Sequence, residues 1–383
     1  MRILIVSEFF PKSESCEFSG GVEHRAYHVA RELAKKHEVT ILAAYEKGAP
    51  KVTEFSGIKV IRCGKQLRYT QKGNILGRLS FIIDSARVGR KLKADIVDGY
   101  NFMSYPQSYF IGKSLGAPKV ITYHDVWVGK WIKHIGPSGL LMEFLERYVL
   151  FNKGKKWDKF ITNSNFTKNN LVNVKIPAEK IQTVYCGVDL DSYKDIYVRK
   201  FERPTVCFIG RWVDYKRVDD LIKAINIVKK DIPNIQLKLI GSGPEENKLK
   251  GLVKELNLED NVDFVGFVEK YQDVMKILKR SHVFSLPSIV EGQGIVTVEA
   301  MACGVPYVNS RIGPTVEITD NGKGGLLFEP KNYGKLATQL LRLFQDKDLY
   351  VKCVKEEKKL VKNFDWKNLA KEIENVYKDV IKL

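Results

Sequence analysis

The stretch that decides the fold runs from Leu286 to Pro306 and reads LPSIVEGQGIVTVEAMACGVP. The apolar residues up to Leu286 predict a buried strand, and the Gly292-Gln293-Gly294 turn predicts the start of a helix that runs to about Ala302. The Gly-Val-Pro at the end of the stretch predicts where this helix stops. A turn that opens a helix leaves backbone N–H groups unpaired at the positive end of the helix dipole. Such a site suits phosphate or another anion.

Two glutamates, Glu291 and Glu299, bracket this turn and are eight residues apart. A helical rise of about 1.5 Å per residue separates them by roughly 8–12 Å. That is too far for two carboxylates acting on one bond, which need to be about 5 Å apart. We therefore expect them to hold opposite ends of an extended, hydroxyl-rich ligand, with its phosphate on the turn. An ordinary surface glutamate beside a helix-cap turn is the alternative that this stretch leaves open.

The whole chain has 383 residues, enough for two domains with full cores. Its hydrophobic content of 44% is that of a globular protein, and no apolar run reaches the roughly 18–20 residues of a membrane span. The apolar run at the N-terminus is short and predicts a buried strand over Ile3–Ser7 rather than a signal peptide. Six scattered cysteines without a Cys-x-x-Cys pair indicate neither zinc nor disulfides and predict a cytoplasmic location.

Short β-branched runs alternate with amphipathic stretches along the chain, which predicts doubly wound parallel sheets. The α/β pattern occurs twice, with the polar segment 191–203 as the linker between the two series. We expect two Rossmann-like domains facing a cleft. The predicted ranges are 1–190 for the N-terminal domain, 204–365 for the C-terminal domain, and 366–383 for a final helix.

Candidate site residues follow the predicted strands, where open α/β sheets bind ligands. They are Gly20-Gly21, His124-Asp125, Gly210-Arg211 with Lys216, Gly241-Ser242-Gly243, and Gly266-Phe267-Val268. Each has an ordinary alternative, because paired glycines are usually turns and a lone histidine at a strand end is usually structural. Their shared placement favours a site.

Four pieces of the sequence together resemble one family. They are GGVE at 20–23, HD at 124–125, GRWVDYKRVDDLIKA at 210–224 and EGQGIVTVEAMACGVP at 291–306. Their order is similar to that of the retaining nucleotide-sugar glycosyltransferases of family 4, which have the GT-B fold. The resemblance covers nearly the whole chain, and the piece from Glu291 to Glu299 is its most specific part. It implies a GT-B arrangement in which 1–190 is the acceptor-side domain, 204–365 binds the nucleotide-sugar, and the helix 366–383 crosses back to the N-terminal domain.

The resemblance implies a role for each matching residue. Arg211 and Lys216, beside Gly210, would hold the donor diphosphate and stabilise the leaving group in place of a metal. Glu299 would accept hydrogen bonds from the ribose hydroxyls. The remaining implied contacts are Glu291 and the N–H groups of Gly292, Gln293, Gly294 and Ile295 on the sugar and phosphate; Gly266, Phe267 and Val268 at the base; Gly21 near the diphosphate; and His124 over the donor sugar.

The resulting prediction is a metal-independent enzyme that needs no cofactor and moves a sugar from a nucleoside diphosphate to an acceptor hydroxyl, with retention at the anomeric carbon. The acceptor would be a glycan or a lipid-linked sugar. No carboxylate is an obvious nucleophile, so departure and attack on one face of the sugar is favoured over a covalent intermediate. Departures from the family pattern at Gln293, Cys186 and Pro314 bear on the identity of the donor sugar.

The net charge of +18 is concentrated in the first half, where residues 1–190 carry 30 Lys and Arg against 17 Asp and Glu. The segment from Lys59 to Lys93 has ten basic residues and one acid, Asp84. A helix is predicted over Ile75–Lys93, and its apolar residues are interleaved with these charges. One interpretation is docking on an anionic membrane surface. The other is core residues beside solvated lysines.

Two further function classes stay open. A nucleotide- or nucleic-acid-binding protein would suit the basic charge, but the basic residues lack a recognition helix or interleaved aromatics, so no nucleic-acid partner is expected. A dehydrogenase would need a Gly-x-Gly-x-x-Gly after the first strand, and none is there.

Overall fold

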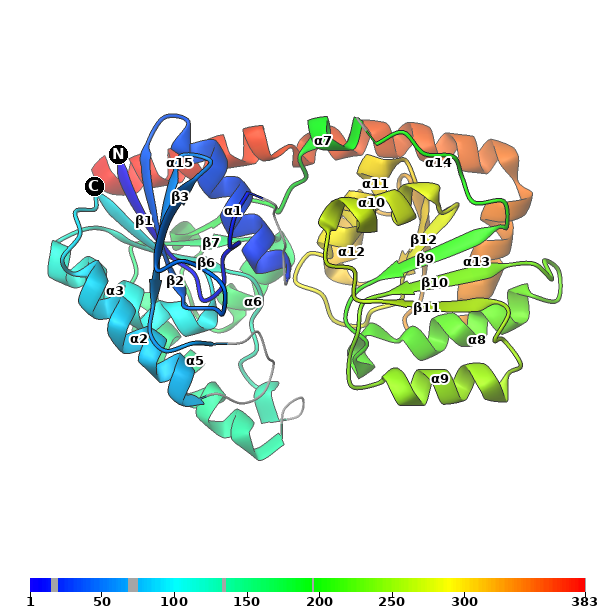
Figure 1. Ribbon diagram of the computed structural model, residues 1–383, viewed down its shortest axis with the longest axis horizontal. Helices are drawn as coiled ribbons and strands as arrows, with labels where there is room; N and C mark the ends of the chain where they lie inside the picture. The colour runs from blue at the N-terminus through cyan, green and yellow to red at the C-terminus, as the bar shows by residue number, and fades with distance from the viewer. Residues whose placement is uncertain (15–19, 68–74, 133–135, 195, 383) are drawn as a thin grey trace. The chain divides into compact units, whose positions relative to one another are not determined.

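A computed structural model describes residues 1–14, 20–67, 75–132, 136–194 and 196–382. The chain divides into two compact units (Figure 1). The first unit is Met1–Cys186 with Trp366–Leu383, and the second is Gly187–Asp365. The segment 191–203, predicted as a linker, therefore falls within the second unit. There the N–H of Phe201 donates to the carbonyl of Arg280 at 2.9 Å, and the Arg280 guanidinium lies over the Phe201 ring.

The first unit is built on a sheet of eight strands within the described residues, in the order β3-β4-β2-β1-β5-β6-β7-β8. All of its pairings are parallel except that of β3 with β4. The strands are β1 (Arg2–Val6), β2 (Glu38–Ala44), β3 (Val52–Phe55), β4 (Ile58–Cys63), β5 (Ile96–Gly99), β6 (Lys119–Tyr123), β7 (Lys159–Thr162) and β8 (Ile181–Thr183). The central strands are buried along almost their whole length, as expected for a parallel sheet covered on both faces.

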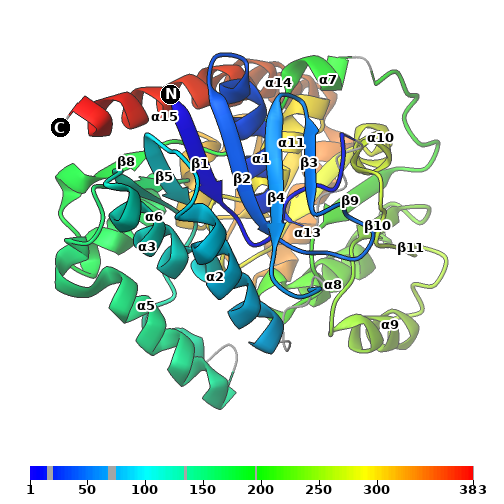
Figure 2. The same ribbon diagram turned by 60° about the vertical axis from the view of Figure 1, so that its left-hand side comes forward.

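Helices cover both faces of this sheet. Helix α1 lies on one face and α2, α3 and α5 lie on the other, as Figures 1 and 2 show. The helices are α1 (Gly21–Ala34), α2 (Ile75–Gly89), α3 (Tyr105–Leu115), α5 (Gly139–Gly154), α6 (Asn165–Asn173) and α15 (Trp366–Lys382).

The C-terminal helix α15 belongs to the first unit and packs along α1. The Trp366 ring stacks on His28 with an angle of 4° between the ring planes. The Tyr377 hydroxyl donates to Asp98 Oδ2 at 2.6 Å, which fixes α15 to strand β5. Together these contacts explain the apolar stripe of this helix, which is buried on α1 and the sheet.

The second unit has a parallel sheet of six strands within the described residues, in the order β11-β10-β9-β12-β13-β14. Its strands are β9 (Thr205–Ile209), β10 (Gln236–Ile240), β11 (Val262–Gly266), β12 (Val283–Leu286), β13 (Tyr307–Ser310) and β14 (Gly325–Phe328). Its helices are α7 (Leu190–Lys194), α8 (Val218–Val228), α9 (Glu246–Glu255), α10 (Tyr271–Arg280), α11 (Ile295–Cys303), α12 (Gly313–Ile318), α13 (Tyr333–Gln345) and α14 (Lys347–Leu360).

Several elements differ from the sequence expectation. The predicted helix from Ile75 to Lys93 ends at Gly89, where Ile111 of α3 leaves no room for a Cβ. Strand β3 was not predicted; it pairs with β4 through a turn in which Ser56 and Gly57 both have positive φ, the geometry of a tight hairpin. Helices α10 and α14 and strand β14 were also missed.

Within the described residues, no helix has the length and apolar character needed to cross a bilayer.

Candidate functional site

The loop between β12 and α11 forms the centre of the candidate site. Gly294 has φ 83° and ψ 53°, a left-handed conformation that favours glycine, and it is the N-cap of α11. The first hydrogen bond of the helix joins the Thr297 N–H to the Gly294 carbonyl at 2.9 Å. The amides of Ile295 and Val296 precede that bond and lie at the positive end of the helix, as predicted for an anion site.

A buried asparagine on the neighbouring strand holds this loop in place. The Asn309 side-chain oxygen accepts from the Leu286 N–H at 2.7 Å, and its amide donates to Thr297 Oγ1 at 3.0 Å. It therefore ties the end of β12 to the first turn of α11. The sequence analysis did not assign this role, although a polar residue in a predicted buried strand was a signal for it.

Lys216 and Glu291 form an ion pair, with 2.5 Å between Nζ and Oε1. Lys216 lies in the loop after β9, and Glu291 lies in the loop after β12. The two strands are neighbours in the sheet, and the N–H of Ile289 donates to the Tyr215 carbonyl at 2.9 Å, which holds the two loops together. The carboxylate thus compensates a lysine charge that is largely removed from water.

Arg211 lies in the loop after β9, as Lys216 does, and its side chain is exposed. Its Nη2 donates to the Tyr215 hydroxyl at 2.7 Å. The backbone before it is tightly packed, because a Cβ at Gly241 would lie 2.0 Å from the Gly210 carbonyl oxygen. Glycine at 241 therefore lets the loops after β9 and β10 approach closely. The second unit places both predicted cations at the same edge of the sheet.

Glu299 is buried in α11, with 4% of its surface exposed. It accepts a hydrogen bond from the Tyr271 hydroxyl at 2.7 Å. Burial raises the pKa of this carboxyl to about 7, and the hydrogen bond from Tyr271 opposes that rise. Tyr271 was missed by the sequence analysis because helix α10, which it begins, was not predicted.

The residues expected around the base and the sugar are also in this unit. Gly266 ends β11 with φ 78°, and Phe267 after it has 61% of its surface exposed, as suits an aromatic ring that stacks on a base. Val268 is half-buried. Gln293, expected to reach a sugar hydroxyl, is buried. Gly292 beside it is half-buried.

Two predicted site residues belong to the first unit. Gly21 is the exposed first residue of α1. His124 follows β6, and its Nε2 is enclosed and has no hydrogen-bond partner among the described residues. Burial, together with the nearby Arg25 guanidinium, lowers the pKa of His124 to about 3, so the ring is neutral.

The buried Arg25 beside His124 is a residue that the sequence analysis did not single out. Its Nη1 donates to the Val184 carbonyl at 2.8 Å and to Cys186 Sγ at 3.3 Å. A charged donor this close to His124 opposes protonation of the ring. The described part of the chain holds no group of three His, Cys, Asp or Glu side chains suited to a metal ion.

Family models match almost the whole chain. The model described as Glycosyltransferase Family 4 matches residues 19–192, and the model described as Glycosyl transferases group 1 matches residues 191–360. The two matches cover the pieces of sequence that suggested the family, and they confirm that resemblance.

Individual proteins agree with the family models. The chain is 27% identical to an uncharacterized glycosyltransferase of Methanocaldococcus jannaschii, over 79% of this chain and 81% of that protein. It is 24% identical to a GDP-mannose-dependent alpha-(1-6)-phosphatidylinositol monomannoside mannosyltransferase of Mycolicibacterium smegmatis, over 90% of this chain and 89% of that protein. Among solved structures, sucrose-phosphate synthase of Thermosynechococcus elongatus has a TM-score of 0.81 at 21% identity, over 100% of this chain and 99% of the other.

The two units, each with a parallel α/β sheet, have the architecture of that structural neighbour, which confirms the predicted fold class. The family models, the relatives and the fold lead to one conclusion. The chain belongs to the nucleotide-sugar glycosyltransferases of family 4, which have the GT-B fold.

Proposed function

We propose that this glycosyltransferase binds a nucleoside-diphosphate sugar in its second unit and transfers the sugar to an acceptor hydroxyl with retention of the anomeric configuration. The observation that carries the proposal is the grouping of two cations, a helix N-terminus and a buried carboxylate at one edge of one sheet. Arg211 and Lys216 supply the cations, α11 supplies the free amides, and Glu299 supplies the carboxylate. A diphosphate joined to a ribose needs this combination of groups.

Each group then has a task in the reaction. Arg211 and Lys216 bind the diphosphate and stabilise the negative charge that grows on it as the bond to the sugar breaks. The amides at the start of α11 bind the same anion, and Glu291 orients both Lys216 and the donor sugar. Glu299 accepts hydrogen bonds from the ribose hydroxyls. Arg211 and Lys216 would thus neutralise the diphosphate, the task that a bound metal ion has in other transferases.

The neutral His124 suits a contact with an uncharged sugar. An imidazole that stays unprotonated offers one donor and one acceptor, which suits a sugar hydroxyl. We infer that it binds a hydroxyl of the donor sugar. We also infer that the acceptor attacks from the face that the diphosphate leaves, because the sequence offers no obvious carboxylate nucleophile for a covalent intermediate.

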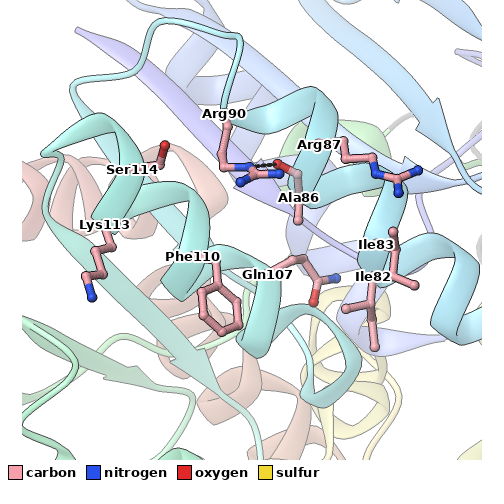
Figure 3. A pocket seen from close by; sticks show the side chains of 9 residues that line it. All are labelled: Ile82, Ile83, Ala86, Arg87, Arg90, Gln107, Phe110, Lys113 and Ser114. Carbon is pink, nitrogen blue, oxygen red and sulfur yellow. Dashed lines mark hydrogen bonds between the residues drawn. The ribbon is translucent and has the colours of Figure 1, made fainter.

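For the acceptor and the location, we propose a glycan or a lipid-linked sugar at an anionic membrane surface. Five large apolar side chains of α5 are each more than half exposed: Leu140, Leu141, Phe144, Tyr148 and Phe151. The outer face of α2 and α3 continues this pattern, with a groove of about 530 Å³ between Ile82, Ile83, Ala86 and Phe110. Arg87, Arg90 and Lys113 surround that groove (Figure 3).

Charge and apolar surface together support this location. No ion pair with a carboxylate is formed by Arg87, Arg90 or Lys113 among the described residues. A lipid leaflet offers apolar chains under phosphate groups, and each basic side chain near an anionic leaflet adds roughly 1 kcal/mol of binding. Of the basic residues counted from Lys59 to Lys93, Arg68 and Lys72 lie outside the described residues. The similarity to a phosphatidylinositol-mannoside mannosyltransferase agrees with a lipid acceptor.

The test of the proposed function is a panel of nucleoside-diphosphate sugars incubated with the enzyme and with soluble and lipid-linked sugar acceptors. Products are identified by mass spectrometry. We expect one donor to give a product larger than its acceptor by one sugar residue. A melting-temperature screen with UDP, GDP, NAD and short oligonucleotides comes first, and stabilisation by NAD or by oligonucleotides alone would contradict the proposal.

A further inference from the structure

A chain of hydroxyl groups lies behind the buried carboxylate of Glu299. Tyr271, the first residue of α10, donates its hydroxyl proton to Glu299 Oε1 at 2.7 Å. The Tyr271 oxygen is also hydrogen-bonded to the hydroxyl of Tyr193 in α7. The three side chains come from three helices of the second unit, and each residue is buried or nearly so.

The direction of these hydrogen bonds follows from the number of protons. A tyrosine hydroxyl has one proton to donate. When Glu299 is ionised, its carboxylate can only accept, so Tyr271 gives its proton to Glu299. The proton between the two tyrosines must therefore belong to Tyr193. A donor that itself accepts a hydrogen bond is polarised and binds a carboxylate more strongly.

The segment that carries Tyr193 is fixed in this position by a further contact. Lys279 of α10 donates from Nζ to the Tyr193 carbonyl at 3.0 Å. Helix α7 lies at the start of the second unit, which begins at Gly187. The relay thus connects the stretch where the chain enters this unit with the carboxylate at the ribose position.

We propose that Tyr271 is a positioning residue for the nucleotide, which acts by holding Glu299 ionised and oriented toward the ribose, and that Tyr193 completes the relay. This inference rests on the proposed ribose contact of Glu299. The titratable groups that face Glu299 are Tyr271 from α10, Tyr193 from α7 and Cys303 from its own helix. None of these three carries a positive charge, so the hydrogen bond from Tyr271 is the contact that stabilises the carboxylate among the described residues.

The relay predicts a specific pH dependence. A carboxylate accepts from both ribose hydroxyls, whereas a protonated carboxyl loses part of that capacity. Without the Tyr271 hydroxyl, the pKa of Glu299 rises above its value of about 7. The nucleotide affinity of Tyr271→Phe is then about five- to tenfold weaker than that of the wild type at pH about 6–7, and nearly equal to it at pH about 9.

The experiment is isothermal titration of the purified protein with UDP, GDP and ADP, from pH about 6 to about 9. The variants are Tyr271→Phe, Tyr193→Phe and the control Tyr350→Phe. Tyr350 in α14 also donates from a largely buried hydroxyl, to the His282 carbonyl at 3.1 Å, and its hydrogen bond and charged neighbours among the described residues do not include Glu299. We expect an upward shift of the binding midpoint in Tyr271→Phe, a smaller shift in Tyr193→Phe, and no shift in Tyr350→Phe.

The outcomes separate the inference from the proposed function. A Tyr271→Phe deficit of the same size at every pH would assign the residue a packing role only and overturn the relay. Unchanged affinity at every pH would overturn it as well. If the wild-type protein bound none of the three nucleotides, the donor site itself would be wrong. The melting temperature of each variant, compared with that of Tyr350→Phe, shows whether the fold is intact.

Discussion

Lys216 Nζ lies 2.5 Å from Glu291 Oε1, and this ion pair joins the loops that follow two neighbouring strands, β9 and β12. Only 14% of the lysine side chain and 10% of the glutamate side chain are exposed. Neither charge is fully hydrated, so each orients the other. The pair places a cation next to the helix N-terminus at Gly294, and this juxtaposition is the basis of the proposed diphosphate site.

The first prediction separates the chemical step from donor binding. In Lys216→Ala, the loss of a preorganised cation that opposes charge on the leaving group lowers kcat by about 10²–10³-fold. In Glu299→Ala, the ribose contact is lost equally from the ground state and the transition state, so KM for the donor rises and kcat changes little. Steady-state kinetics at saturating acceptor measures both effects.

The control for this pair is Lys250→Ala, which removes an exposed lysine of α9 that pairs with Glu246. Its kinetics should match the wild type. A turnover number of Lys216→Ala equal to that of the wild type, in a folded protein, would remove Lys216 from the proposed mechanism.

The second prediction concerns metal ions. Because Arg211 and Lys216 are proposed to neutralise the diphosphate, transfer should continue in excess EDTA at the rate seen without it. Initial rates with and without EDTA are the measurement. A loss of activity that magnesium or manganese restores would mean that the two cations do not act in place of a metal.

The third prediction is a stability effect of Glu357 in α14. This carboxyl is fully buried, and neither of its oxygens has a hydrogen-bond partner among the described residues. Burial raises its pKa well above the ordinary value, although Lys200 opposes the rise. In the unfolded chain a glutamate ionises at about pH 4.3, whereas in the folded protein Glu357 stays protonated to a higher pH. The folded state is therefore most stable below about pH 4.3, and its free energy of unfolding falls as the pH rises from there through the folded pKa.

The neutral variant Glu357→Gln removes that loss. Its melting temperature should exceed that of the wild type by about 2–4 °C at pH about 8 and by much less at pH about 5, in scanning calorimetry. The neighbouring Glu356→Gln is the control, because Glu356 pairs with Lys359 at the surface. Destabilisation of Glu357→Gln at both pH values would show that the buried carboxylate is ionised and paired in solution.

The fourth prediction tests the membrane surface. A double variant, Leu141→Glu with Phe144→Glu, puts two charges on the exposed apolar face of α5. It should bind anionic vesicles at least about tenfold more weakly than the wild type in co-sedimentation, since each apolar side chain contributes about 1.5–3 kcal/mol when it leaves water. Its activity on a soluble acceptor should not change.

The matched control for that variant is Val351→Glu, which places a charge at an exposed apolar position on α14 of the second unit. It should bind vesicles like the wild type. The wild-type protein could bind neutral and anionic vesicles equally, or bind them independently of salt. Either result would contradict a membrane-docking role for the basic and apolar face of α2, α3 and α5.

The sequence predicted those parts of the site that are set by local signals. The glycine turn, the start of α11 and its end at Gly304 follow from the preferences of glycine and proline, which act within a few residues. The Lys216–Glu291 pair could not be predicted as a contact, because its members are 75 residues apart and meet only through the order of strands in the sheet.

Helices α10 and α14 were missed for different reasons. Helix α10 begins after Lys270, which makes no side-chain cap, so Tyr271 was not recognised as part of a helix facing Glu299. Helix α14 follows α13 with only Asp346 between them, and the prediction placed a helix over Tyr333–Phe344 and assigned no second helix between it and the C-terminal one. The Asp346 side chain accepts from the Leu349 N–H at 2.8 Å, so an N-cap signal was present in the sequence.

The most direct test of the central claim is the anomeric configuration of the first product. NMR spectroscopy of the product that forms from an α-linked nucleoside-diphosphate sugar and the acceptor reports that configuration, which is stable once the glycosidic bond has formed. The proposed donor site and same-face attack predict a product that is α-linked from the first time point. A β-linked first product, or no transfer from any nucleoside-diphosphate sugar in the panel, would contradict the account.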